Sequence, residues 1–195
     1  MTTEEKASHK GKQKAGKGDV EGTQGGTFLD LELGTFFLGD KNLGSKLFVR
    51  KCYQELAEVT MGVVESGYNL VITGNPGIGK SFFLFFFMHF LHQQEANPTI
   101  VLFRHLERRW YLFSKGEVLL TVEADGPSVF QKYLDDPNTW YLVDTAQPLQ
   151  VNAKTLMVSS PYVERYKEYL KTKAQLRFMP IWSKEEIDIC RKVSV

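Results

Sequence analysis

Short apolar runs alternate with longer segments of helical spacing through most of the chain. Runs of β-branched and aromatic residues predict strands at 69–73, 99–104, 139–144, 154–159 and 175–179. Apolar residues three and four positions apart predict helices at 80–93, 128–134, 162–172 and from 183 onward. This alternation indicates an α/β fold in which helices cover both faces of a mainly parallel sheet, a three-layer α/β/α sandwich.

Two of the apolar runs are separated by only a short polar turn. Residues 110–113 and 117–122 flank Ser114, Lys115 and Gly116. Paired runs around a glycine-containing turn predict a β-hairpin. Because this hairpin falls between the second strand and the short helix at 128–134, we expect a small insertion in the α/β domain.

The composition divides the chain into three parts. Residues 1–26 are rich in lysine, glycine, glutamine, threonine and glutamate, which predicts a disordered tail. Residues 27–67 are a leading segment, in which 45–65 has apolar residues at helical spacing and predicts a helix that packs beside the main domain. Residues 68–195 form that domain, since a chain of 195 residues can bury one good core.

Charge and composition exclude several functional classes. The formal net charge is +1, so charge gives no support to nucleic acid as a partner. The two cysteines lie far apart in the sequence and provide neither a disulfide framework nor a zinc site. The most apolar stretch, 82–91, is too short to span a bilayer, and no secretory signal is visible at the start. We expect an intracellular protein of the cytoplasm or nucleus, with no membrane partner.

A glycine-rich loop follows the first strand of the main domain. It matches the Walker A pattern GxxxxGK(S/T), and a helix is predicted directly after it. Glycines let the backbone turn tightly enough for its N–H groups to surround phosphates, and the positive end of the helix dipole adds to the attraction. The expected P-loop, which would bind ATP or another nucleoside triphosphate, consists of Gly74, Asn75, Pro76, Gly77, Ile78, Gly79, Lys80 and Ser81.

Three side chains are expected to meet the charged end of the nucleotide. Lys80 should reach the β- and γ-phosphates, and the Ser81 hydroxyl should ligate Mg²⁺. The run 139–144 ends in Asp144, the form expected of a Walker B strand, so Asp144 should hold the same Mg²⁺ from the opposite side. The alternative is an aspartate that only forms a turn at the end of its strand.

The residue after Asp144 bears on the reaction. Many ATPases of the additional-strand class carry a carboxylate there to orient the attacking water, whereas this chain has Thr145. A threonine hydroxyl is a weak base, so we expect slow hydrolysis. Glu123, Asp125 or a side chain of a partner are the alternatives for positioning the water.

The next strand ends in a pair of serines followed by Pro161. Ligands of open α/β sheets bind at the carboxyl ends of the strands, so Ser159 is a candidate catalytic residue that senses the γ-phosphate or the water. In the alternative interpretation, Ser160 caps the following helix. The sequence leaves open which arginine completes the site, the candidates being Arg104, Arg108, Arg109 and Arg165.

Four stretches together resemble one family. They are YNLVITGNPGIGKSFFL, WYLVDTAQP, KTLMVSSP and RFMPIWSKEEI. In order and spacing they resemble the P-loop ATPase module of the Crinkler effectors of oomycetes and fungi and of the retrotransposon hot spot proteins of trypanosomes. The first motif fits many NTPase families, whereas VSSP combined with MPxWSxEE is much narrower. The resemblance covers roughly residues 48–192.

The resemblance implies an AAA-like or STAND-like ATPase core of the additional-strand class. In the family this core is normally followed by a helical lid and, in many members, by a nuclease-like or kinase-like effector domain. Members are linked to secretion into host cells and action in the nucleus, so a host-cell location follows if this chain is a Crinkler-type effector. This sequence lacks a recognisable LFLAK-type motif and ends soon after 182–192, so we expect the lid and effector domain to be absent.

Two functions fit these residues. The first is a slow Mg²⁺-dependent ATPase that uses Lys80, Asp144 and Ser159, with a protein partner or a lid supplied in trans. The second is a non-hydrolysing, nucleotide-dependent interaction or effector module, which Thr145 favours. A small-molecule kinase fits less well, because no arginine-rich lid segment follows the fourth strand.

Overall fold

The computed structural model describes residues 19–23, 26–94 and 98–193. Its strands are β1 (Asp19–Thr23), β2 (Gly26–Asp30), β3 (Lys46–Val49), β4 (Asn69–Thr73), β5 (Ile100–Arg104), β6 (Arg109–Ser114), β7 (Glu117–Val122), β8 (Trp140–Asp144), β9 (Lys154–Val158) and β10 (Ala174–Phe178). Its helices are α1 (Lys51–Glu65), α2 (Lys80–Gln94), α3 (Gly126–Val129), α4 (Gln131–Leu134), α5 (Lys167–Leu170) and α6 (Lys184–Val193). Three short 3-10 turns are η1 (Phe37–Gly39), η2 (Lys41–Leu43) and η3 (Val163–Arg165).

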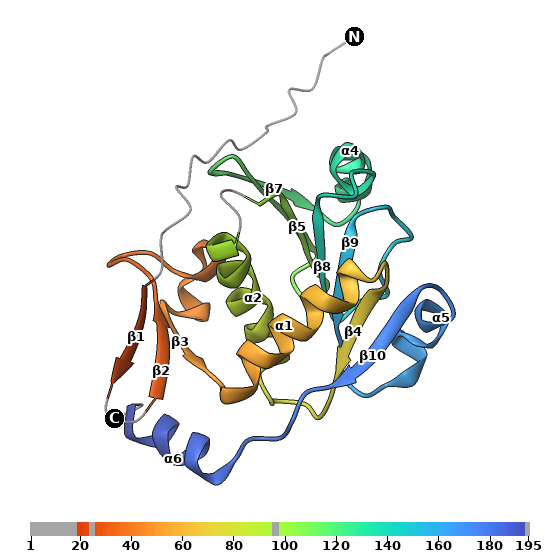
Figure 1. Cartoon of the computed structure of the whole chain (residues 1–195). Helices are drawn as coiled ribbons and strands as arrows, with labels where there is room; N and C mark the ends of the chain where they lie inside the picture. The colour runs from red at the N-terminus through yellow and green to blue at the C-terminus, as the bar shows by residue number, and fades with distance from the viewer. Residues whose placement is uncertain (1–18, 24–25, 95–97, 194–195) are drawn as a thin grey trace.

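The central sheet has seven strands in the order β10-β4-β9-β8-β5-β6-β7 (Figure 1). The first five of these run parallel to their neighbours, and β6 and β7 are antiparallel. The carboxyl ends of the five parallel strands therefore meet at one edge of the sheet. This arrangement confirms the expected α/β fold with a mainly parallel sheet.

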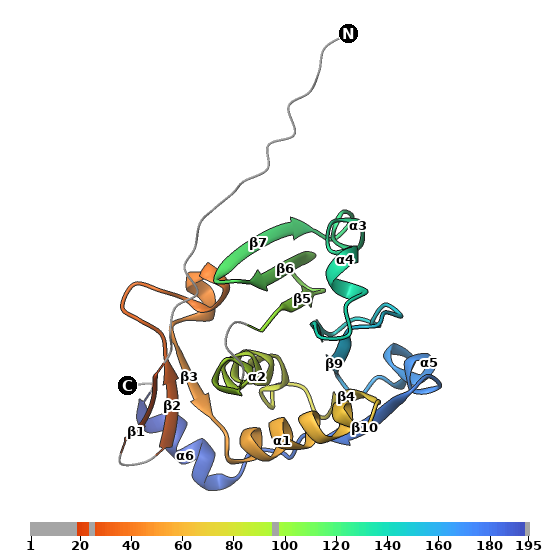
Figure 2. The same ribbon diagram turned by 45° about the horizontal axis from the view of Figure 1, so that its top comes forward.

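Side chains of the parallel strands alternate between two cores, as the pleat of a strand requires. In β8, Trp140 and Leu142 belong to the core that α1 and α2 cover, whereas Tyr141 and Val143 belong to the other core. Phe130 and parts of α4 and α5 complete that second core. Helices thus pack on both faces of the sheet (Figure 2), which is why its central strands are apolar on both sides.

Helix α2 is apolar on almost every side because it is enclosed by other layers. Phe87 packs edge-on against Trp140 of the sheet, with ring centroids 5.0 Å apart. Phe85 stacks on Phe37 of η1 at 5.3 Å, and Phe83 contacts Tyr53 of α1. Five phenylalanines of this helix (Phe83, Phe85, Phe86, Phe87 and Phe90) are therefore core residues, as the sequence predicts, whereas Phe82 is 40% exposed.

The strands of the main domain are confirmed to within one residue at each end, as are the helix at 80–93 and the start of the last helix. The hairpin is also confirmed, but it is not an insertion outside the sheet. Strand β6 pairs with β5, and β7 pairs with β6, so the hairpin extends the central sheet at one edge.

The expected helix at 45–65 is wrong in its first turn. Residues 46–49 form β3, in which Leu47 and Phe48 pair with Leu29 and Phe28 of β2. Three consecutive apolar residues cannot distinguish strand from helix by periodicity, and the strand that pairs with them lies outside this segment. The helix α1 begins after Arg50.

Three further boundaries differ from expectation. The tail predicted at 1–26 includes Asp19–Thr23, which pairs with β2 as β1, and the rest of that tail except Gly26 lies outside the described residues. The helix predicted at 128–134 is two single turns separated at Phe130, which is fully buried. The helix predicted at 162–172 is reduced to η3 and α5, with Tyr166 and Tyr169 buried in the second core.

Candidate functional site

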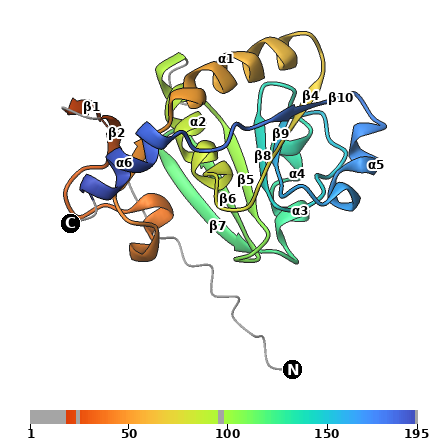
Figure 3. The same cartoon turned by 90° about the horizontal axis from the view of Figure 1, so that it is seen from below.

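The predicted site residues meet at the carboxyl edge of the central sheet. The glycine-rich loop follows β4, Ser159 follows β9, Asp144 ends β8 and Arg104 ends β5. These strands are successive neighbours, and β4, β9 and β8 lie side by side in Figure 3. The fold therefore brings together four segments that are far apart in the sequence.

The loop between β4 and α2 needs its glycines for conformation and for space. Gly74, Gly77 and Gly79 have φ angles of 149°, 77° and 95°, which side chains disfavour. A Cβ atom at Gly79 would lie 2.5 Å from the Tyr53 hydroxyl, and one at Gly74 would lie 2.6 Å from Cδ1 of Ile78. The tight turn thus depends on glycine at both ends.

Three successive carbonyl groups of the loop are held from outside by side chains. The Gly77 carbonyl accepts a hydrogen bond from Nε1 of Trp182 at 3.2 Å. The Ile78 carbonyl accepts one from Arg50 at 2.8 Å, and the Gly79 carbonyl accepts one from the Tyr53 hydroxyl at 2.7 Å. Because the C=O and N–H of a trans peptide point in opposite directions, the N–H groups of residues 78–80 point away from these three side chains.

This arrangement prepares the loop for an anion. Three aligned N–H groups at the start of a fifteen-residue helix combine fixed donors with the positive end of the helix dipole. The side chains that fix the carbonyls come from the first turn of α1 with the residue before it, and from the segment before α6, so the loop is clamped between two segments that are far apart in the sequence.

Lys80 is folded onto the same loop. Its Nζ donates to the carbonyl oxygens of Gly74 at 2.6 Å and Asn75 at 2.7 Å, and the residue is 9% exposed. Burial lowers the pKa of Lys80, and the neighbouring Asp144 carboxylate opposes that shift. The ammonium group is therefore partly compensated by two loop carbonyls and lies near the Asp144 carboxylate.

Ser81 and Asp144 are brought together as predicted. The Ser81 hydroxyl donates to Oδ1 of Asp144 at 2.9 Å, and the Thr145 hydroxyl donates to the same oxygen at 2.9 Å. The second oxygen of Asp144 lies 3.5 Å from Nε of Arg104. Thr145 has a φ of 71°, unusual for a β-branched residue, so the backbone is strained directly after the carboxylate.

The donor set at Ser81 and Asp144 fits magnesium in its chemistry. A hydroxyl and a carboxylate oxygen are hard ligands, and Mg²⁺ is usually held by one or two such groups together with phosphate oxygens and water. Among the described residues there is no cluster of three or more His, Cys, Asp or Glu that could hold a metal. At this position the chain would supply a hydroxyl and a carboxylate oxygen, and phosphate oxygens or water would complete the coordination of magnesium.

Ser159 has a buried hydroxyl without a protein partner. The residue is 1% exposed, and within the described part of the chain its Oγ makes no hydrogen bond. Its backbone is fixed, because its N–H donates to Ile72 and its carbonyl accepts from Thr73. The capping alternative for Ser160 is not found, since η3 begins only at Val163 and has Tyr162 at its cap position.

Replacing Ser159 with Ala separates a ligand-binding role from a structural one. Leaving a buried hydroxyl unpaired costs about 1–3 kcal/mol, so Ser159→Ala should leave the free energy of unfolding unchanged or raise it. If the Ser159 hydroxyl bonds to the triphosphate or to the attacking water, the variant should bind the triphosphate or hydrolyse it about tenfold less well. Urea unfolding and nucleotide titration measure the two effects, and a less stable variant with unchanged nucleotide properties would assign Ser159 to structure alone.

The other candidate arginines do not converge on this site. Arg108 is exposed and pairs with Glu123 at 2.8 Å, and Arg165 donates to Ser160 at 3.4 Å. Arg109 is also exposed. Of the four arginines considered, Arg104 is the one beside Asp144.

Sequence reasoning missed the residues that support the loop, above all Arg50. This guanidinium is 2% exposed, pairs with Glu186 at 3.0 Å and donates to the Pro180 and Ile181 carbonyls as well as to Ile78. Glu186 also forms reciprocal hydrogen bonds with Ser183, a capping box at the start of α6. The S-x-x-E spacing signals that cap, but no local pattern connects it to Arg50.

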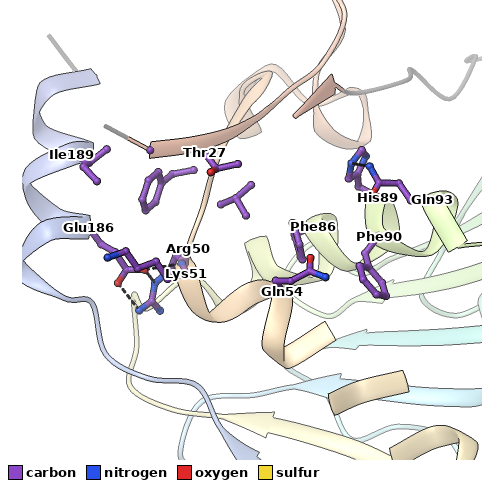
Figure 4. Close-up of a pocket in the computed structure, with 13 residues that line it drawn as sticks. Thr27, Arg50, Lys51, Gln54, Phe86, His89, Phe90, Gln93, Glu186 and Ile189 are labelled. Carbon is purple, nitrogen blue, oxygen red and sulfur yellow. Dashed lines mark hydrogen bonds and ion pairs between the residues drawn. The ribbon is translucent and has the colours of Figure 1, made fainter. Parts of the chain in front are cut away.

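A separate groove lies next to the Arg50–Glu186 ion pair. It has a volume of about 440 Å³ and is lined by side chains that include Thr27, Phe48, Gln54 and Phe90 (Figure 4). Arg50 and Glu186 form part of its wall, but no residue of the 74–81 loop lines it. The groove is thus distinct from the glycine-rich loop.

Comparison with known proteins finds two relatives with similar sequences. Crinkler effector proteins 15 and 16 of Phytophthora infestans are each 29% identical to this chain over 155 residues. The match covers 73% of this chain and 24% of each relative, so the chain spans about a quarter of the length of these curated relatives. The chain is Crinkler-like. No protein-family model matches it.

The Crinkler-like chain has no helix, among its described residues, with the length and apolar character to cross a membrane. Helix α2, its most apolar helix, is covered by the sheet and by α1. Packing within the domain thus covers most of the apolar surface of α2, with Phe82 left exposed.

Proposed function

We propose that this chain binds a magnesium nucleoside triphosphate, with ATP as the first candidate, and hydrolyses it slowly. The observation that carries the proposal is the clamped loop: three successive carbonyls are held outward by Trp182, Arg50 and Tyr53. Lys80 at the start of α2 supplies a buried cation beside the same loop. A fixed set of N–H donors with one ammonium group is suited to a polyphosphate rather than to a neutral ligand.

The sheet order supports a P-loop NTPase of the additional-strand class. Strand β9 lies between β4, which carries the loop, and β8, which carries Asp144. Ser159 at the end of β9 then lies between the two motifs, where a γ-phosphate or its attacking water would be contacted. This is the module that the sequence resembles in Crinkler and retrotransposon hot spot proteins, in the AAA-like and STAND-like group.

The residues of the chain have distinct roles in this proposal. The loop N–H groups and Lys80 bind and orient the phosphates, and Ser81 and Asp144 hold the magnesium ion. Mg²⁺ bound with the nucleotide would neutralise charge on the phosphates as the terminal bond breaks. Ser159 orients the terminal phosphate or the water.

A non-hydrolysing interaction module is the second candidate. It is favoured by Thr145, whose hydroxyl is bonded to Asp144 and which supplies no carboxylate to activate water. In this case nucleotide binding alone would change the affinity for a protein partner or for a lid supplied in trans. Because the relatives are named effectors, we propose an effector role for either candidate, in the cytoplasm or nucleus of a host cell.

The proposed magnesium site is tested by a double-mutant cycle. Ser81→Ala and Asp144→Asn should each reduce the gain in ATP affinity that Mg²⁺ provides. The double variant should lose less than the sum, because both residues act on one ion. Titration calorimetry with ATP, in Mg²⁺ and in EDTA, measures the effect.

Ser160→Ala is the matched control, since this neighbouring serine lies away from Asp144 and contacts Arg165. Combined with Asp144→Asn it should give additive losses. Full additivity of Ser81→Ala with Asp144→Asn would instead mean that Asp144 has no part in an ion site and only ends its strand.

A further inference from the structure

A second carboxylate lies beside Asp144, on the turn that joins β5 to β6. Arg104, the last residue of β5, forms an ion pair with Glu107 through NH1 and approaches Asp144 through Nε. One guanidinium group therefore contacts both carboxylates, which places Glu107 on the other side of Arg104 from Asp144. Sequence analysis gives no sign of this, because the approach depends on the parallel pairing of β5 with β8.

The position of Glu107 is fixed by its neighbours. Oε2 of Glu107 accepts a hydrogen bond from the Tyr111 hydroxyl at 3.0 Å. The N–H of His105 donates to the Asp144 carbonyl at 3.2 Å, which fastens the turn to the end of β8. Arg104 is 9% exposed and lies over the ring of Phe85 at 5.5 Å, so its guanidinium is confined as well.

Glu107 is held firmly and yet reaches solvent. Its side chain is 27% exposed, against 6% for that of Asp144. Burial raises the pKa of Tyr111, and the charge of Glu107 raises it further, so the tyrosine remains a proton donor at neutral pH. A carboxylate with a fixed orientation and access to water meets a geometric requirement for a group that orients water.

The other carboxylates considered for this role are placed less well. Glu123 pairs with the exposed Arg108 at 2.8 Å and lies 3.7 Å from His105, on the outer side of the turn. Asp125 precedes α3 at the end of the hairpin. Neither contacts Arg104 or Asp144 in the described structure.

We propose that Glu107 is the carboxylate that orients and deprotonates the attacking water, an inference that rests on the proposed nucleotide hydrolysis. The water oxygen forms a bond to the γ-phosphorus, and the bond from that phosphorus to the β–γ bridging oxygen breaks. Its electron pair leaves on the bridging oxygen of the nucleoside diphosphate. The proton of the water passes to Glu107, which then releases it to solvent. In this assignment the turn between β5 and β6 supplies the carboxylate that Thr145, directly after β8, does not provide.

The test compares Glu107→Gln with Glu123→Gln, which makes the same change at the competing carboxylate candidate. Glu107→Gln should lower phosphate release from ATP by about a hundredfold or more, the size of a general-base contribution. Its ATP affinity should stay within about twofold of the unmodified chain, because the water-orienting group acts mainly in the transition state. Glu123→Gln should change neither quantity.

A second readout does not depend on turnover. ADP with aluminium fluoride mimics the transferring phosphoryl group together with its attacking water, so Glu107→Gln should bind this complex at least tenfold more weakly than the unmodified chain does. Tyr111→Phe retains the carboxylate but removes the hydroxyl that orients it, and should lower phosphate release less, with unchanged ATP affinity. If a urea titration shows that Glu107→Gln is unfolded, Tyr111→Phe tests the role of Glu107 instead. Unchanged phosphate release in that variant would count against the role.

The outcomes separate this inference from the proposal beneath it. If the unmodified chain binds no ATP, nucleotide binding itself is wrong and Glu107 has no such role. If it binds ATP but releases no phosphate, the interaction-module alternative holds and Glu107 is not a base. If ATP binds and Glu107→Gln releases phosphate at the unmodified rate, Glu107 is excluded while the proposed hydrolysis stands.

Discussion

Replacing Arg50 with Ala should lower the free energy of unfolding by about 3–5 kcal/mol, the range measured when one member of a buried ion pair is removed. The side chains of Arg50 and Glu186 are 1% and 4% exposed, so the variant leaves the carboxylate buried without its charge partner. It also removes the donor to the Ile78, Pro180 and Ile181 carbonyls. Urea unfolding of the two proteins measures the difference.

A double variant tests whether the unpaired charge causes that loss. Arg50→Met combined with Glu186→Leu removes both charges and retains similar volume, so it should be more stable than Arg50→Met alone. If the double variant is as unstable as the sum of the single changes, packing rather than charge accounts for the effect.

The same pair predicts how stability depends on pH. Burial alone would raise the pKa of Glu186, but hydrogen bonds from Arg50, Ser183 and Lys51 outweigh burial and leave it below its usual value. Since the folded-state pKa is lowered, the pair contributes stability at neutral pH. That contribution is lost as the pH falls from the ordinary range of glutamate through the lowered pKa.

The motifs that lie in one stretch of chain were predictable from the sequence. The glycine-rich loop is recognisable from its local sequence, because it lies between a predicted strand and a predicted helix. Asp144 is recognisable because it ends a clear apolar run. Their meeting at one edge followed from the parallel sheet, because parallel strands place their carboxyl ends together. The contact between Ser81 and Asp144 is the result of that topology.

The features that were not predictable from the sequence depend on contacts between elements that are far apart in the chain. Arg50 and Glu186 are 136 positions apart, and neither is unusual in its own window. Glu107 lies three residues after Arg104 in a turn, but its nearness to Asp144 requires the register in which Arg104 pairs with Asp144. The error at 46–49 has the same origin, since its strand partner β2 lies on the far side of a loop.

Lys80→Ala is expected to weaken ATP binding roughly ten- to a hundredfold, the equivalent of one hydrogen bond from a charged donor. ADP binding should weaken much less, because the ammonium group serves both the β- and the γ-phosphate and ADP lacks the latter. Burial lowers the pKa of Lys80, so the folded chain without ligand holds this charge at a cost. Since Lys80 also donates to the Gly74 and Asn75 carbonyls, urea unfolding of the variant is measured alongside, so that a loss of folding is distinguished from a loss of binding.

Lys80→Arg is the matched control, because it retains the charge but not the shape of a single ammonium group at the end of a flexible stem. Arg at this position should fail to restore ATP affinity fully, since the buried space around Nζ is shaped by the carbonyls of Gly74 and Asn75. Full recovery would indicate a site that responds to charge alone.

The most direct test of nucleotide binding at the glycine-rich loop is titration calorimetry of the unmodified chain and Lys80→Ala with ATP and ADP, each in the presence of Mg²⁺. The account predicts saturable binding of one nucleotide per chain, with a larger loss for ATP than for ADP when Lys80 is removed. A folded, unmodified chain that shows no saturable binding, or an equal loss for both nucleotides, would contradict it.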